Sequence, residues 1–204
     1  MEHGDALTPG SITLRLGIVL LLVLANGFFV AAEFALVGAR RSKIDHMAAS
    51  GDALAQTVQH ALTHLDRYIS GTQLGITLAS LALGWLGEPA LAALIDRLFA
   101  ALGMEISSGA AHTGAAIALA FLVITFLHIV LGELAPKSMA LAMPERVSGV
   151  IALPLILFSK VMAPFIAVLN GTANWLLRRL GFQPMSGEAH QVHSPEEIRM
   201  LVMQ

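Results

Sequence analysis

The chain lacks cysteine altogether and has little charge, and these two absences exclude several classes of protein. With no thiol among its 204 residues, it can form no disulfide, no thiolate metal site and no cysteine nucleophile. Charged residues make up only 13% of the sequence, and 12 basic residues nearly balance 14 acidic ones, so nothing indicates a nucleic-acid partner. Apolar residues are in excess at 56%, which is typical of a membrane protein.

The N-terminus does not have the pattern of a secretory signal peptide. Glu2 and Asp5 stand where such a peptide carries positive charge, and the apolar run that follows, residues 12–37, is too long. About 26 residues make roughly 39 Å of helix, which is enough to cross a bilayer with some tilt. We therefore predict a first membrane span at 12–37, preceded by an extracytoplasmic N-terminus at 1–10.

Two polar residues of this span, Asn26 and Glu33, lie seven positions apart and so share one face two turns apart. Because lipid cannot solvate them, this face should look into protein or a cavity. Arg40, Arg41 and Lys43 follow the span at once, and such a cluster marks the cytoplasmic side. The N-terminus is therefore predicted to lie outside.

Residues 42–66 have apolar residues at helical spacing but are too polar to span, so they predict one juxtamembrane helix at the cytoplasmic interface. His60 and His64 stand at i, i+4 on its polar face, as a metal-binding pair would. No third ligand is near in the sequence, so a solvated polar face is the better interpretation.

A second span is predicted at 68–86, running outward. Its polar residues recur at steps of three and four from Ser70 to Ser80 and include Thr77, so they line one face. Hydrogen bonds between helices would account for this face. If it meets the polar face of the first span, it would instead line an ion path.

Gly87-Glu88-Pro89 predicts a break, followed by a short amphipathic helix at about 89–102 on the outer side. The third span is predicted at 111–133, running inward. His128 and Gly132 share a face of it by spacing. We interpret His128 as a hydrogen-bonded packing residue rather than an ion ligand.

The third span ends in Gly132-Glu133-Leu134-Ala135-Pro136-Lys137. Pro136 has no N–H, which leaves the carbonyl of Gly132 without its helical donor. A free carbonyl beside the Glu133 carboxylate makes an oxygen-rich pocket of the kind that suits Mg²⁺ or Ca²⁺. On these residues alone, an ion pair between Glu133 and Lys137 at i, i+4 explains the carboxylate equally well.

The apolar stretch at 147–177 is interrupted by prolines and polar residues. As a fourth span it would put Arg178 and Arg179 outside, against the charge rule. We therefore predict three spans, with two short cytoplasmic-side helices at about 146–160 and 163–180.

Residues 181–204 form a polar linker in which Ser194 and Pro195 look like a helix start. That helix is cut off at Gln204, so we expect a cytoplasmic domain to follow in the complete protein.

Three motifs, in this order, resemble the CNNM/CorC family over about residues 10–180. They are Asn26-Gly-Phe-Phe-Val-Ala-Ala-Glu33, Gly71-Thr-Gln-Leu-Gly-Ile-Thr-Leu-Ala-Ser80 with Gly87-Glu-Pro89, and Gly132-Glu-Leu-Ala-Pro-Lys137. The resemblance implies an all-α integral membrane protein of the bacterial inner membrane, with three transmembrane helices within a domain at 11–180, working as a homodimer.

The resemblance also implies a function. Family members are linked to Mg²⁺ export, with Na⁺ proposed as the exchanged ion, and carry tandem CBS domains that bind ATP with Mg²⁺; such domains would follow this chain. The alternative is a non-transporting membrane anchor or sensor for those domains. Because no nucleophile–base constellation is present, we do not expect an enzyme.

By position, the resemblance assigns Glu133 and the carbonyl of Gly132 to the metal site, together with Asn26 and Ser80. Many members have Ser where this chain has Val30, and Glu33 lies one turn further on. The predicted ligands of a dehydrated Mg²⁺ are therefore Glu133, Gly132, Asn26, Ser80, Thr77 and Glu33.

Overall fold

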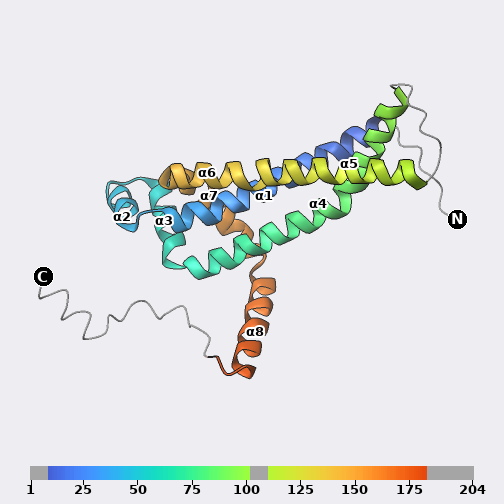
Figure 1. Ribbon diagram of the computed structural model, residues 1–204. Helices are drawn as coiled ribbons and strands as arrows, with labels where there is room; N and C mark the ends of the chain where they lie inside the picture. The colour runs from blue at the N-terminus through green and yellow to red at the C-terminus, as the bar shows by residue number, and fades with distance from the viewer. Residues whose placement is uncertain (1–8, 102–109, 183–204) are drawn as a thin grey trace, which may run out of the picture. The chain divides into compact units, whose positions relative to one another are not determined.

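The structure, a computed structural model, describes residues 9–101 and 110–182. The chain forms two compact units, and the boundary between them in the sequence falls between Val161 and Met162. All regular structure in these ranges is helical (Figure 1), which confirms the predicted all-α fold. Three segments are long and apolar enough to cross a membrane, Thr13–Gly38, Leu65–Gly87 and Ala118–Ala142. A fourth would be counted only if the helices Pro144–Val161 and Ala163–Arg179 formed one span.

Helix α1 (Pro9–Gly38) is the central helix of the first unit. It packs along α4 (Leu65–Ala101), and in Figure 1 these two helices and α5 (Ala110–Ile129) run lengthwise beside one another. Small side chains make the close packing of α1 possible, because Ala31, Ala32 and Ala35 are almost fully buried.

Helix α4 corrects the prediction of a break at Gly87-Glu88-Pro89, because it continues without interruption from the second span to Ala101. The turn signal is overridden by packing beyond it. Ala90, Leu91 and Ile95 are buried in one apolar cluster with residues of α1 and α5, so extending the helix buries a continuous apolar face. The short helix expected at 89–102 is thus the outer part of α4.

The third span is also longer than predicted and passes through three segments. After α5 come a π-helical turn, η1 (Val130–Leu134), and α6 (Ala135–Ala142). The N–H of Ala135 bonds the carbonyl of Val130, five residues back. Such a π turn is the local response to Pro136, which cannot supply the next N–H.

The helix predicted at 42–66 is in fact two helices, α2 (Arg41–Ala49) and α3 (Ala53–Thr63). Gly51 lies between them with a φ of +94°, a conformation that favours glycine. Asp52 then caps α3, since its carboxylate accepts the N–H groups of Leu54 and Ala55 at 2.9 and 3.2 Å.

Two short helices follow the third span, close to the predicted bounds. Helix α7 (Pro144–Val161) packs in the first unit, where Ile151, Ala152 and Leu155 join the core of α1 and α3. Helix α8 (Ala163–Arg179) belongs to the second unit. The predicted N-terminal segment is described only from Pro9, and the linker with its helix start at Ser194 lies outside the described residues.

Candidate functional site

One side chain, Asn26, joins all three spans at a buried point. Its side chain is only 2% exposed. The amide nitrogen donates to the carbonyl of Gly132 at 2.9 Å, and the amide oxygen accepts from the hydroxyl of Ser80 at 3.1 Å. Residues 26, 80 and 132 therefore form one polar cluster, the Asn26 cluster, with one member from each span.

The neighbours of Gly132 would crowd any side chain at this position. A Cβ atom at this position would lie 3.0 Å from Cδ2 of His128, 3.4 Å from Nδ2 of Asn26 and 3.4 Å from the carbonyl oxygen of Val23. Gly132 lies within the π turn, and the close approach of α1 brings Asn26 to its carbonyl. The predicted release of this carbonyl from helical bonding thus ends in a bond to another span.

His128 is a neighbour of the cluster that the sequence interpretation set aside. Its ring adjoins Gly132, and with Ser80 and Thr125 it lines a cavity of about 170 Å³ between α4 and α5. The helical spacing of His128 and Gly132 predicted that they share a face, and the structure agrees. His128 therefore belongs to the polar surroundings of the cluster.

The other predicted ligands are not joined to Asn26 by any hydrogen bond in the structure. The Thr77 hydroxyl donates to the carbonyl of Gln73 in its own helix at 2.8 Å. Glu33 is half-buried on α1, and seven residues place it about 10 Å along the axis from Asn26. Glu133, next to Gly132, is exposed in the single chain.

The ion pair considered for Glu133 and Lys137 does not form in the structure. Within the ranges described, both ion pairs involve Glu145 instead. The ammonium of Lys137 lies over the ring of Phe34, 4.5 Å from its centroid, in a cation–π contact. The carboxylate of Glu133 is therefore not neutralised by Lys137.

The chemistry of the cluster is that of neutral oxygens. In the described part of the chain, no group of three or more His, Cys, Asp or Glu side chains is arranged to hold a metal. A cation at the Asn26 cluster would be bound by a main-chain carbonyl, an amide oxygen and a hydroxyl, with Glu133 as the nearest carboxylate in sequence. Such ligands suit a hard cation.

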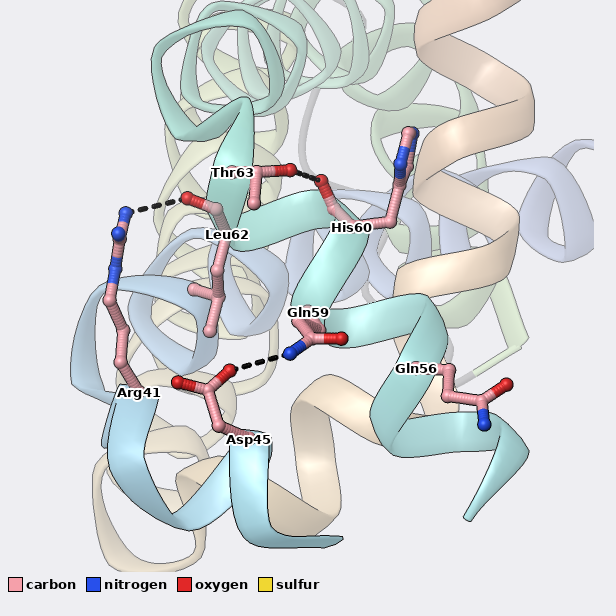
Figure 2. A pocket seen from close by; sticks show the side chains of 7 residues that line it. All are labelled: Arg41, Asp45, Gln56, Gln59, His60, Leu62 and Thr63. Atoms are coloured by element: carbon pink, nitrogen blue, oxygen red, sulfur yellow. Dashed lines mark hydrogen bonds between the residues drawn. The ribbon is translucent and has the colours of Figure 1, made fainter. Parts of the chain in front are cut away.

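A separate polar pocket of about 420 Å³ lies between α2 and α3, away from the predicted ligands (Figure 2). Its polar groups bond one another. Arg41 donates to the carbonyl of Leu62 at 2.6 Å, and Gln59 donates to the carboxylate of Asp45 at 2.7 Å. His60 also lines it, and its ring lies 5.0 Å from that of His64.

Together, the fold and the Asn26 cluster define a multi-pass α-helical membrane protein with polar groups held between its spans. The sequence matches the family of the Cyclin M transmembrane N-terminal domain, CNNM, over residues 16–204. The chain belongs to this family, as the three motifs predicted.

Several relatives are similar over nearly the whole chain. UPF0053 protein YhdT of Bacillus subtilis is 46% identical over 181 residues, covering 89% of this chain and 38% of the relative. YugS of the same organism is 43% identical, covering 93% and 43%. Synechocystis protein sll0260 is 32% identical, covering 95% and 42%. The chain therefore spans less than half the length of these relatives.

Proposed function

We propose that this chain is the membrane domain of a Mg²⁺ transporter that passes the ion through the Asn26 cluster. The proposal agrees with membership of the CNNM family, which is broadly linked to Mg²⁺ transport across membranes. The observation that carries it is the carbonyl of Gly132. Pro136 cannot supply its usual helical donor, Gly132 is buried, and the carbonyl accepts from a side chain that also accepts from Ser80.

The hydrogen bonds of Asn26 suggest how the site alternates between empty and occupied. With its nitrogen toward Gly132, the amide satisfies that carbonyl when no cation is bound. Rotation of the amide by a half turn would direct its oxygen to the same place, so that two oxygens could bind a cation that has lost water. This matters because Mg²⁺ gives up its waters reluctantly and prefers oxygen ligands at about 2.0–2.1 Å.

The two carboxylates have different parts in this proposal. Glu133 follows Gly132 directly, so it supplies charge at the cluster itself. Glu33 lies about two turns along α1 and would attract the ion at another level of the same path. We propose that Na⁺ is exchanged for Mg²⁺.

A homodimer accounts for polar side chains that the single chain leaves exposed on a spanning helix. Gln73 and Thr77 are exposed on α4, where lipid would solvate them poorly. A second copy would cover them. We propose a bacterial inner-membrane location with the N-terminus outside, and regulation by ATP-binding CBS domains in the longer protein.

The test is Mg²⁺ efflux from loaded liposomes that contain the purified chain. Glu133→Ala should abolish the efflux without dissociating the dimer, since it removes the charge at the cluster. Asp66→Asn, which removes an exposed carboxylate at the start of α4, is the control and should leave efflux unchanged. Efflux by Glu133→Ala at the wild-type rate would contradict the assignment.

One observation favours the alternative of a non-transporting anchor for cytoplasmic domains. The hydrogen bonds among Asn26, Gly132 and Ser80 are complete by themselves, as in ordinary packing between helices. On this alternative, Mg²⁺ would neither bind the purified chain nor raise its melting temperature. A Mg²⁺-dependent rise that Glu133→Ala removes would exclude the anchor.

A further inference from the structure

Two cavities of the first unit adjoin at the start of α7. The first, called here the head-group pocket, has a volume of about 720 Å³ and is lined on one side by Arg40, Lys43 and Arg146. The second, called here the acyl groove, has a volume of about 460 Å³. Arg146 and Val150 line both, so the two cavities form one continuous surface.

The head-group pocket carries excess positive charge. Its two acidic residues are already bonded. The carboxylate of Glu145 accepts from Arg40 at 3.1 Å and pairs with Lys43 at 3.2 Å, and Asp52 caps α3. Arg146 is exposed, and the part of the chain that the structure describes offers it no ion-pair partner. Three cations against two carboxylates leave one positive charge without a counter-ion.

Glu145 stays ionised in this pocket. Burial alone would raise its pKa, but the hydrogen bonds from Arg40 and Lys43 together outweigh burial and lower it. Arg40 and Lys43 are therefore each paired with an ionised carboxylate, and each has donor groups left over. Both side chains remain largely accessible, at 71% and 48% exposure for Arg40 and Lys43.

The acyl groove is almost wholly apolar and runs along the spans. Its walls come from α1, the η1–α6 segment and α7, and include Leu24, Phe28, Leu131, Met139 and Ile151. Leu24 lies 14 residues before Gly38, the last residue of the first span. This is about 21 Å of helix, more than half the thickness of a hydrocarbon core.

The head-group pocket lies at the level of lipid head groups, and the acyl groove lies at the level of acyl chains. Arg40 follows the end of the first span, and Arg146 lies four residues after Ala142, where the third span ends. The cations are thus at one membrane surface, and the groove runs from them into the bilayer. A charged pocket joined to an apolar groove matches the two halves of a phospholipid.

We propose that this surface binds an anionic glycerophospholipid, with its phosphate at Arg40, Lys43 and Arg146 and one acyl chain in the groove. Arginine and lysine recognise phosphate through charge-assisted hydrogen bonds, and the unpaired charge of Arg146 favours an anionic over a zwitterionic lipid. The groove favours a lipid over soluble phosphate. Pockets of this size commonly hold small ligands.

The bound acyl chain would contact the segment that carries the Asn26 cluster. Leu131 belongs to η1, and Pro136 follows it in α6; both line the groove. Gly132, whose carbonyl accepts from Asn26, follows Leu131 directly in η1. A lipid bound in the groove would therefore contact the π turn directly, whether or not the cluster transports an ion.

The head-group contact can be tested by native mass spectrometry of the purified chain with phosphatidylglycerol or phosphatidylcholine. The wild type should retain phosphatidylglycerol in preference. Arg146→Gln should weaken that binding about tenfold, while Arg146→Lys should restore most of it. Lys160→Gln removes one exposed cation from the same helix outside both cavities and should bind as the wild type does.

The groove is tested by Met139→Trp, whose larger side chain would block it. Met139 is 48% exposed, so the ring can be accommodated without disturbing the core. Leu141→Trp, on the same helix at 55% exposure and outside both cavities, is the control. Only the first should lower phosphatidylglycerol binding, by several-fold.

Three outcomes would overturn the proposal. The wild type could bind both lipids equally, which would show that the cations do not select an anionic head group. Glycerol phosphate could compete as well as the lipid, which would indicate a soluble phosphate site. Finally, the Met139 and Leu141 variants could bind alike, which would remove the groove from the interaction.

Discussion

At the scale of single residues, Asn26 has the largest effect on the arrangement of the spans. Its amide both donates and accepts, so it can satisfy a main-chain carbonyl and a hydroxyl from two other helices at once. An apolar residue of similar size would fill the same space but would leave the carbonyl of Gly132 buried without a donor. The cost of Asn26 substitution is thus that of an unsatisfied acceptor.

We expect Asn26→Leu to lower the free energy of unfolding by about 1–3 kcal/mol, the usual cost of an unsatisfied buried group. Ser80→Ala should cost less, about 0.6 kcal/mol, because it breaks one hydrogen bond between helices, whereas Asn26→Leu breaks both hydrogen bonds of the cluster. Unfolding in mixed micelles, titrated with dodecyl sulfate, measures both. Equal losses for the two variants would contradict the ranking.

At the scale of the helices, α1 and α4 meet through an aromatic ring packed on glycine. A Cβ atom at Gly75 would lie 2.5–2.6 Å from three ring atoms of Phe29. That ring cannot move freely, because it packs against Phe28 at 5.1 Å and Phe158 at 4.7 Å between centroids. The two helices can thus approach this closely because Gly75 has no side chain.

Gly75→Ala should therefore destabilise the protein by about 1–3 kcal/mol through overpacking. Gly84→Ala is a matched control on the same helix, because nothing lies within 4 Å of its added methyl group. It should be neutral or slightly stabilising. Phe29→Leu in the Gly75→Ala background should recover stability. Thermal unfolding in detergent checks all three, and equal melting temperatures for the two alanine variants would refute the clash.

Hydrophobicity alone was enough to locate the membrane spans, but it did not show where helices continue and where they break. The run from residue 12 to 37 coincides with α1 because its length and composition leave no other structure in a membrane. Gly87-Glu88-Pro89 gave a false break because the apolar face continues past it to Ile95. Conversely, Gly51 and Asp52 divided a helix whose apolar stripe appeared continuous.

The site was predictable where a local rule acted, and less so where helices had to meet. The missing N–H of Pro136 correctly indicated a disturbed carbonyl at Gly132. That Asn26 would bond it depends on the register of two helices 106 residues apart, which spacing along one helix does not fix.

At the scale of the whole molecule, the number and direction of the spans decide which side every site faces. Arg40, Lys43 and Arg146 gather at one end of the spans, where α1 ends and α7 begins. The positive-inside rule predicts that this end is cytoplasmic. With three spans the chain ends inside; a fourth span formed by α7 and α8 would place Arg178 and Arg179 outside.

The absence of cysteine makes this topology directly measurable, because each introduced thiol is the only one in the chain. We expect Ser42→Cys, beside the cation cluster, to react with a membrane-impermeant maleimide only after cells are permeabilised. Ser107→Cys, between α4 and α5, should react in intact cells and serves as the positive control. Ser186→Cys, after α8, distinguishes the alternatives: protection in intact cells agrees with three spans, whereas labelling equal to that of Ser107→Cys would require a fourth.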